Sequence, residues 1–501
     1  MEYTDASWHP DSTSTIPIFR QLVHHLRTQI QSGILVPGAQ LPPQRALAQQ
    51  LRVNRSTIVA AYQELQADGL VHGHAGGGTI VRSLERDDDT APGIYDWHDI
   101  LDRGSFIHDR SLATEVAQAR TLPHVVSLAQ GELAADMRPT AALRELFRAA
   151  PVTEEWLGYE GAFGYQPLRE AIAAHMRARG VPAQPENVLL LAGAQQGLYL
   201  ICRGLLQAGD TVVVEAPSYL LTLGVLQMAG LRVLRAPLDQ HGLIPDQLEA
   251  LLARHRVAMI FTVPAYQNPT SAVLAPSRRT ALLDLCEQYR VPLVEDDVYG
   301  ELGFDGISPT PLYALDAGSY VIYVGSISKS VSPGLRAGWL IGPPHLVKRL
   351  AEMKYHMHYG SSIVPEWVAQ QWLAQGYHAA HITRTAQALR ARRDILEAEL
   401  RQQFGPLLSW LPPRGGFHLW ARVNAPISST SLFRRALREG IGIKPGSLYG
   451  VPAHQCWIRL SFQHASPDDL RAVPSTLRRV VDELIRDGQD PDLLGSEAAG
   501  I

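Results

Sequence analysis

Gly325-Ser-Ile-Ser-Lys-Ser-Val-Ser-Pro-Gly-Leu-Arg336 holds one of only four lysines in a chain of 501 residues. Arginine carries almost all other basic charge, so Lys329 stands out among small hydroxyl residues, with Arg336 seven positions later. A desolvated lysine amine can form an imine with an aldehyde, and an arginine nearby can bind a phosphate. Because pyridoxal phosphate (PLP) carries both groups, this stretch predicts a PLP site. A solvated surface lysine in a Ser-rich loop is the alternative that the local composition allows.

The same stretch resembles the lysine motif of fold-type I aminotransferases. By that resemblance Lys329 forms the Schiff base with PLP, and Ser326, Ser328 and Arg336 bind the phosphate. The resemblance extends from about residue 124 to 486, where short apolar runs alternate with amphipathic helical patterns, as is typical of a parallel α/β sheet. We expect strands at 188–191, 211–215, 258–263, 293–295 and 320–324.

Candidate cofactor residues follow these expected strands, where ligands gather in open α/β sheets. In Gly193-Ala-Gln-Gln-Gly197, the backbone amides of Ala194 and Gln195 open a helix and suit a phosphate. By resemblance, Tyr219 stacks on the pyridine ring, and Tyr159 reaches the phosphate from the partner subunit of a dimer.

A PLP site also needs an acid that keeps the pyridine nitrogen protonated. Asp296 ends an apolar strand and precedes Tyr299 by three residues, a pair that resembles the pyridinium acid and a donor to the phenolate oxygen. Asp297 is the neighbouring candidate. Asn268 resembles a second partner of the phenolate oxygen. Arg459, in Trp457-Ile-Arg-Leu-Ser-Phe462, matches the arginine that binds an effector or substrate carboxylate, for which a guanidinium fork is suited.

Each of these motifs is weak alone, because an Asp after a strand is commonly a turn former and Asn-Pro a plain turn. Their order and spacing carry the resemblance. Two positions depart from the family pattern: Leu133, where proline is usual, and Arg138, where phenylalanine is common. Both are expected near the substrate entrance, so an ordinary aminotransferase pocket is not implied.

The N-terminal segment, residues 16–83, has a different pattern of apolar residues. Apolar residues recur at helical spacing from Phe19 to Ile30, a short helix is expected over 44–51, and a third begins near Arg55 and closes at Asp68-Gly69. Two short apolar runs on either side of a Gly-rich segment then predict a β-hairpin. Helix, helix, turn, helix and hairpin make a winged helix-turn-helix.

Polar residues fall where such a module contacts DNA. Arg55, Ser56 and Thr57 open the third helix, whose N-terminal end enters the major groove in helix-turn-helix docking. Arg45 opens the second helix, and Gly76 would let the wing approach a groove closely. The segment is basic within a chain of net charge −4. It resembles the GntR-type winged helix, with Pro43 in place of the usual serine; a protein-interaction module without DNA affinity is the alternative.

Composition excludes several classes of protein. The isoelectric point near 6.6 excludes a protein that is basic overall, so any nucleic-acid contact comes from a local patch. Three widely separated cysteines have no metal-ligand spacing, and no metal site is expected. The N-terminus lacks the pattern of a signal peptide, and no apolar run reaches transmembrane length, so we expect a cytoplasmic protein without membrane contact.

The expected organisation is therefore an α/β protein with a winged helix-turn-helix at 16–83, a linker at 84–123, an aminotransferase-like PLP domain at 124–486 and a disordered tail at 487–501. This combination resembles the MocR group of transcriptional regulators. The resemblance implies a homodimer that binds double-stranded DNA and responds to PLP, an amino acid or an amine through Lys329. A working aminotransferase with an accessory winged helix is the alternative.

Overall fold

The computed structural model of the chain describes residues 8–11, 16–32, 34–74, 78–82, 112–119, 122–222, 224–316, 318–452 and 454–488. The chain divides into two compact units, Met1–Arg103 and Gly104–Ile501. Each unit has its own buried apolar core.

The N-terminal unit is the predicted winged helix. Its elements are α1 (Ile18–Gln31), β1 (Gln40–Leu41), α2 (Gln44–Gln50), α3 (Arg55–Ala67), β2 (Val71–His74) and β3 (Gly78–Val81). Leu26, Ile58 and Leu65 are fully buried where the helices meet. The two-residue strand β1 was not predicted; it pairs with β3 and makes the hairpin a three-stranded sheet. Because two residues carry no alternation pattern, the sequence gives no signal for it.

The C-terminal unit is built on one large sheet with the strand order β5-β12-β11-β10-β9-β6-β7-β8. Its strands are β5 (Val188–Leu191), β6 (Thr211–Ala216), β7 (Arg232–Asp239), β8 (Gly242–Leu243), β9 (Val257–Thr262), β10 (Leu293–Asp296), β11 (Val321–Ser326) and β12 (Gly338–Ile341). Neighbours from β11 to β7 are parallel, whereas β12 runs antiparallel to both β11 and β5. The expected mostly parallel sheet is confirmed.

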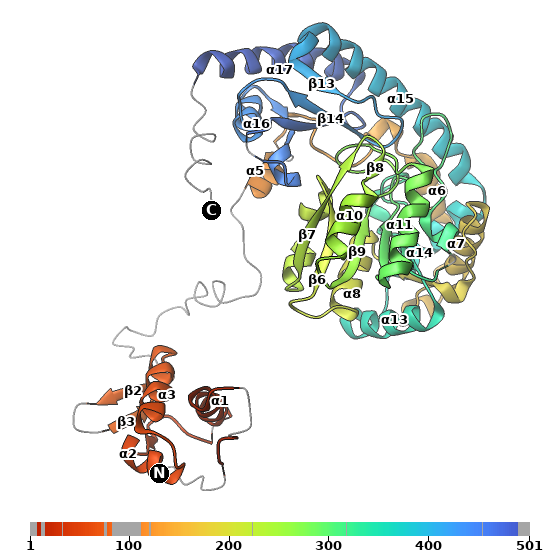
Figure 1. Cartoon of the computed structure of the whole chain (residues 1–501). Coiled ribbons are helices and arrows are strands. Elements are labelled where there is room, and N and C mark those ends of the chain that lie inside the picture. The colour runs from red at the N-terminus through yellow and green to blue at the C-terminus, as the bar shows by residue number, and fades with distance from the viewer. Residues whose placement is uncertain are drawn as a thin grey trace, which may run out of the picture. The chain divides into compact units, whose positions relative to one another are not determined.

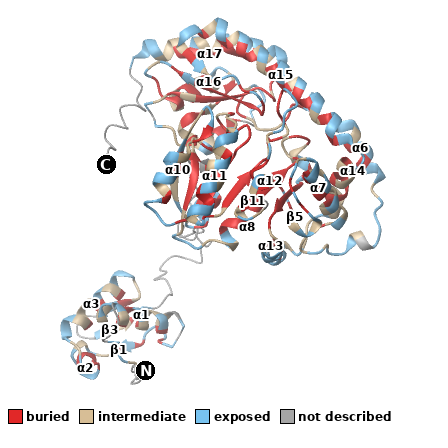
Figure 2. Cartoon of the chain, turned by 45° about the vertical axis from the view of Figure 1, so that its right-hand side comes forward, coloured by how far each residue is buried: buried red, intermediate tan, exposed pale blue. Residues whose placement is uncertain are grey.

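Helices cover both faces of this sheet (Figure 1). One layer contains α8 (Ala194–Gly204), α9 (Gly224–Met228) and α13 (Pro344–His358). The other contains α6 (Thr140–Ala149), α7 (Gln166–Ala178), α10 (Pro245–Leu252), α11 (Pro276–Tyr289), α12 (Leu312–Asp316) and α14 (Ile363–Ala374). Apart from β7, the strands are accordingly buried on both sides, as Figure 2 shows, and successive residues such as Val188 and Leu189 face opposite layers.

A smaller lobe completes the unit. Its strands are β4 (Val126–Ser127), β13 (Leu408–Trp410), β14 (His418–Val423), β15 (Ile441–Gly442), β16 (Lys444–Pro445) and β17 (Trp457–Ser461). The sheet β13-β14-β17-β16 packs against α15 (Tyr377–Phe404), α16 (Ser429–Arg438) and α17 (Pro467–Asp487). Of these helices, α15 and α17 form the outer side of the lobe in Figure 1. The pair β4–β15 joins the segment after residue 122 to this lobe.

The expected linker at 84–123 contains one described helix, α5 (Leu112–Ala119). Val116 and Ala119 are buried in the core of the small lobe, and Glu115 forms a bidentate ion pair with Arg434. The structure therefore places the end of that segment in the C-terminal unit. Most of the linker, Gly76 of the wing and residues 489–501 of the expected tail lie outside the described residues. No helix in the described ranges is long and apolar enough to cross a membrane.

Candidate functional site

The large sheet brings most of the predicted PLP residues to one edge. Asp296 is the last residue of β10 and Ser326 the last residue of β11, while Ala194 follows β5 after a short turn. The antiparallel β12 begins at Gly338, directly after Arg336, and so starts at the same edge. Residues scattered over more than a hundred positions thus meet where parallel strands end, as open α/β sheets arrange their ligand sites.

Lys329 lies in the turn after β11, and its side-chain nitrogen donates a hydrogen bond to the carbonyl oxygen of Gly131, 2.7 Å away. An added β-carbon at Gly131 would lie 3.4 Å from that nitrogen. Lys329 is only partly exposed, which excludes the solvated surface lysine that local composition had allowed. Gly131 carried no signal in the sequence, because its role depends on a contact between distant segments.

An anion cradle lies beside this lysine. The Ser326 hydroxyl donates to the Ala337 carbonyl at 2.8 Å and lies 2.9 Å from the Ser328 hydroxyl. Gly193 caps α8 with a φ of +93°, and a β-carbon there would lie 2.7 Å from the Arg336 guanidinium. Only glycine therefore lets the arginine lie this close to the start of α8, where it donates a hydrogen bond to the carbonyl of Ala192. Helix N-terminus, guanidinium and hydroxyls together form an anion-binding arrangement.

The two adjacent aspartates have different environments. Asp297 accepts hydrogen bonds from Arg179 at 2.7 Å and from the Tyr323 hydroxyl at 2.9 Å. Asp296 is 1% exposed, accepts a hydrogen bond from the Tyr219 hydroxyl, and leaves Oδ1 without a partner. Burial raises the pKa of Asp296 to about 6, although the Tyr219 hydrogen bond and the Lys329 charge oppose the rise. A buried carboxyl with a free oxygen suits a cationic N–H, which Asp297 is not placed to bind.

Asn268, Tyr299 and Arg459 form a second cluster. The Asn268 side-chain oxygen accepts a hydrogen bond of 2.9 Å from Arg459, and its backbone oxygen accepts one from the amide of Tyr219. The Tyr299 hydroxyl lies 3.2 Å from Nε2 of His418. His418 was missed by sequence reasoning. Burial, with the charges of Arg459 and Lys329, holds its pKa well below the usual range, so it is a neutral partner that positions Tyr299.

Arg459 is 3% exposed on β17. Its second terminal nitrogen donates to the Ala129 carbonyl at 2.7 Å, and its Nε has no partner. Among the residues that the structure describes, no carboxylate forms an ion pair with this guanidinium. A buried cation held only by neutral acceptors suits a carboxylate, because a charge removed from water gains most from an opposite charge.

Tyr159 stands apart from these groups. Its side chain is 88% exposed, and its ring lies 5.9 Å from the ring of Tyr359, centroid to centroid. The contact with a phosphate that was predicted for Tyr159 concerned the site of a partner subunit, and it stays a prediction. The stacking role expected of Tyr219 also stays a prediction.

Glu215 is a further group that the sequence did not mark. Its buried carboxyl accepts hydrogen bonds from Thr262, from the amide of Val263 and from the side chain of Gln267. Gln267 in turn donates to the Pro217 carbonyl at 2.8 Å. These bonds fix the loop of Asn268 against the loop of Tyr219. Glutamate in a strand has no sequence signature for such a role.

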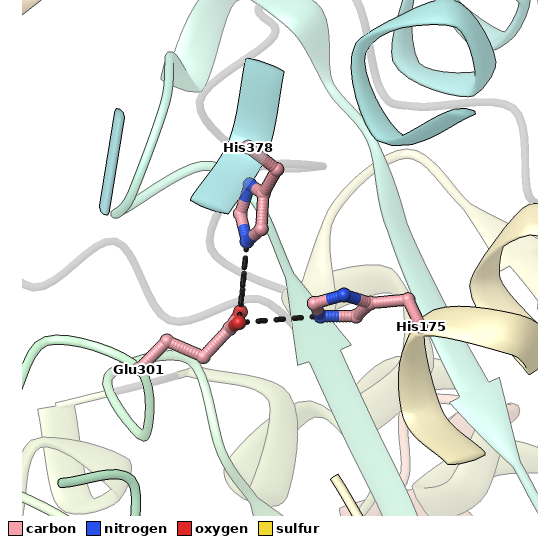
Figure 3. Close-up of side chains that lie close together, drawn as sticks. All are labelled: His175, Glu301 and His378. Carbon is pink, nitrogen blue, oxygen red and sulfur yellow. Dashed lines mark hydrogen bonds and ion pairs between the residues drawn. The ribbon is translucent and has the colours of Figure 1, made fainter. Parts of the chain in front are cut away.

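A histidine–glutamate cluster lies outside the predicted site (Figure 3). Glu301 lies 3.3 Å from Nε2 of His175 and 3.1 Å from Nε2 of His378. Three such groups can hold a metal ion. However, Nε1 of Trp372 donates a hydrogen bond of 3.1 Å to Nδ1 of His378. The proton of the neutral ring is therefore on Nε2, which donates to Glu301 and has no lone pair for a metal. We interpret the cluster as a polar clamp in which Glu301 links α7 and α15.

The exposed face of the winged helix carries unpaired arginines. Asn54 caps α3 by accepting the amide of Ser56 at 3.0 Å, and the Ser56 hydroxyl bonds the same oxygen. Arg45 and Arg55 are exposed at the starts of α2 and α3 and form no ion pair with any described residue, whereas Arg27 is paired with Asp68. Thr57 is half-buried beside Arg55. Each helix start places a positive side chain at the positive end of a helix dipole, which suits phosphate oxygens.

Two family models match the chain. The model for aminotransferase class I and II covers residues 123–475, and the model for bacterial regulatory proteins of the gntR family covers residues 19–81. Among curated relatives, the uncharacterized HTH-type transcriptional regulator YdfD of Bacillus subtilis is 35% identical over 94% of this chain and 97% of its own length. The HTH-type transcriptional regulator NorG of Staphylococcus aureus is 27% identical over 86% of this chain and 97% of its own length.

Solved structures resemble the C-terminal unit. Kynurenine aminotransferase of Pyrococcus horikoshii, solved in complex with PMP, has a TM-score of 0.69 and 29% identity, covering 74% of this chain and 94% of its own. The α-aminoadipate aminotransferase LysN of Thermus thermophilus, complexed with N-(5'-phosphopyridoxyl)-L-leucine, has a TM-score of 0.71 and 26% identity, covering 78% of this chain and all of its own.

Proposed function

The chain belongs to the aminotransferase class I and II family and carries a GntR-family helix-turn-helix ahead of that domain, and we propose that it is a PLP-binding transcriptional regulator of the MocR type. The observation that carries the proposal is the pairing, in one chain, of a GntR-family helix-turn-helix with a domain that gathers PLP-type groups at one sheet edge. The curated relatives that share nearly its whole length are named as transcriptional regulators.

The residues present fit PLP. Asp296 offers a buried carboxyl oxygen without a partner, Lys329 offers an amine at the same strand edge, and Arg336 with the start of α8 offers an anion cradle that a side chain at Gly193 would fill. When bound, the cofactor supplies an aldehyde for amines and an electron-withdrawing ring. In this proposal Lys329 holds the aldehyde carbon, Asp296 keeps the ring nitrogen protonated, and Asn268 and Tyr299 bind the ring oxygen.

Arg459 gives the site a preference for effectors that bear a carboxylate. Its guanidinium is directed to the same region as Asn268, so an amino acid bound there would place its amine towards Lys329. Tyr219 would cover the pyridine ring of the cofactor. In the segment after Gly131, Glu132 and Arg138 neutralise each other in an ion pair of 3.1 Å. The proposed effector is PLP itself, an amino acid or a related amine, and of these Arg459 favours the amino acid.

The winged helix would contact operator DNA through Arg45, Arg55, Ser56 and Thr57, with Gly76 in the wing. A regulator must bind its effector with different affinity in two arrangements, since otherwise no DNA-binding equilibrium shifts. We infer a homodimer, because paired winged helices suit repeated or inverted half-sites, and because the exposed Tyr159 is then available to the partner's phosphate site. Such a protein acts in the cytoplasm, where bacterial DNA lies.

Two measurements on the full-length protein test the proposal. Binding to the DNA upstream of its own gene should be specific and should weaken with salt, because phosphate contacts release counterions. Mixing the PLP-loaded protein with amino acids and a keto acid should give a single spectral change without turnover. Sustained turnover together with absent DNA binding would instead establish the working aminotransferase.

A further inference from the structure

A groove between the large sheet and the small lobe has no role in the function proposed above. It encloses about 980 Å³, within the range of small-molecule pockets. One wall is formed by the β7–β8 hairpin and residues 270–276. The other is formed by residues 409–414, Trp420, residues 450–452, Gln455 and Trp457. Neither Lys329 nor Asp296, Arg336 or Arg459 lines it.

The groove is lined by three indole rings. Trp420 and Trp457 stack with ring centroids 5.4 Å apart. Two contacts fix the orientation of Trp410. Its Nε1 donates a hydrogen bond of 2.8 Å to Glu397, and the guanidinium carbon of Arg401 lies 5.1 Å from the centroid of its ring. Rings fixed in this way offer flat apolar surface without further loss of side-chain freedom, which favours an aromatic ligand.

The charges of the groove favour an anion. Asp239 is neutralised by a bidentate ion pair with Arg278, at 2.6 and 2.7 Å. Arg414 is exposed and forms no ion pair with any described residue, although its backbone carbonyl is fixed by the amide of Phe304. Arg414 also lines an adjoining cavity of about 430 Å³, where the acidic Asp305 pairs with Arg390 instead.

We propose that this groove is a second ligand site that takes a small aromatic carboxylate, with its ring against the three tryptophans and its carboxylate on Arg414. A guanidinium fork binds a carboxylate bidentately, and the indoles exclude water from the contact.

A ligand in this groove would affect the packing of Arg459. Trp420 lies opposite Arg459 in the β14–β17 ladder. Its ring packs edge-to-face on Tyr449 at 5.5 Å, and Tyr449 lies 5.6 Å from the Arg459 guanidinium. A ligand that moves Trp420 therefore changes the packing of the arginine proposed to bind the effector carboxylate.

The test uses the full-length protein, phenylacetate as the probe and phenylacetamide as its neutral match, with tryptophan fluorescence and calorimetry as readouts. Phenylacetate should bind and quench fluorescence, and phenylacetamide should bind about tenfold more weakly, as expected for one lost ionic contact. Arg414→Gln and Trp457→Leu should each weaken phenylacetate binding about tenfold or more.

Arg422→Gln is the matched control, since Arg422 is exposed on β14 but does not line the groove, and it should bind as the wild type does. Arg459→Gln should also still bind, which separates this site from the proposed effector site. Loss of binding in Arg459→Gln with retention in Arg414→Gln would overturn the proposal. So would absence of binding by the wild type, or a fluorescence change that depends on protein concentration alone, which would assign the groove to a contact between copies.

Discussion

The amine of Lys329 is hydrogen-bonded to the carbonyl of Gly131, 198 residues earlier in the chain. The segment around Gly131 belongs to the small lobe through the Ser461 amide, which donates to Leu128 at 2.8 Å. An amine that reacts with an aldehyde gives up N–H donors, so cofactor capture and this contact compete. The reaction proposed for Lys329 is thereby linked to the contact between the small lobe and the large sheet. A ligand-responsive regulator needs such a contact, made in one state and broken in the other.

Arg55→Ala should weaken operator binding by about tenfold or more, because the start of α3 loses its one exposed cation. PLP uptake should be unchanged. Arg27→Ala is the control, since Asp68 already neutralises Arg27. Fluorescence anisotropy with labelled operator DNA measures the affinity of each variant. Equal affinities for wild type and Arg55→Ala would refute the placement of α3 in the groove.

Arg459→Gln should abolish the response to effectors that carry a carboxylate while leaving PLP binding intact. The reason is that the glutamine keeps polar contacts near Asn268 but removes the buried positive charge. Spectral titration with an amino acid and with the corresponding amine distinguishes the two classes. Undiminished amino acid affinity in the variant would show that the carboxylate binds elsewhere.

Asp296→Asn should stabilise the PLP-free protein at pH 8. The folded-state pKa of Asp296 is raised to about 6, so its favourable contribution exists at low pH and is lost as the pH rises through about 6. Removing the charge should add up to about 3 kcal/mol to the free energy of unfolding at pH 8, and about half as much at pH 5. The same variant should bind PLP more weakly.

Denaturant unfolding followed by tryptophan fluorescence measures the Asp296 effect. Asp297→Asn is the matched control and should be less stable at pH 8, because it leaves Arg179 buried without its carboxylate partner. A pH-independent effect of Asp296→Asn would contradict the assigned environment.

Glu301→Gln should destabilise the C-terminal unit by about 1–3 kcal/mol at neutral pH. Although burial opposes it, hydrogen bonds from His175 and His378 hold the pKa of Glu301 well below its usual range. A depressed pKa stabilises the folded state above the ordinary carboxyl value, and this contribution is lost only as the pH falls below that value. The difference from wild type should therefore hold from pH 7 to about pH 5 and shrink below the ordinary glutamate pKa of about 4.3. A chelator should leave the wild-type thermal midpoint unchanged; a marked drop would identify a metal ion.

Sequence patterns sufficed for the winged helix, the parallel strands and most of the residues at the strand edge, because periodicity and turn residues mark them locally. They missed β7 (Arg232–Asp239), whose mixed residues break the apolar run, and the antiparallel β12 (Gly338–Ile341), whose direction depends on the whole sheet. The sequence alone does not fully distinguish Asp296 from Asp297 as the acid for the ring nitrogen. The structure does, because Arg179 donates a hydrogen bond to Asp297. Gly131, Glu215 and His418 act through contacts between distant segments, which no local pattern records.

The central claim is that Lys329 covalently holds PLP. The most direct measurement is borohydride reduction of the full-length protein incubated with PLP, followed by peptide mass mapping, for the wild type, Lys329→Ala and Lys348→Ala, the last changing an exposed lysine of α13. The account predicts a single modified peptide containing Lys329 in the wild type and in Lys348→Ala, and none in Lys329→Ala. A wild-type protein without the adduct, or a Lys329→Ala variant that keeps it at full yield, would contradict the account.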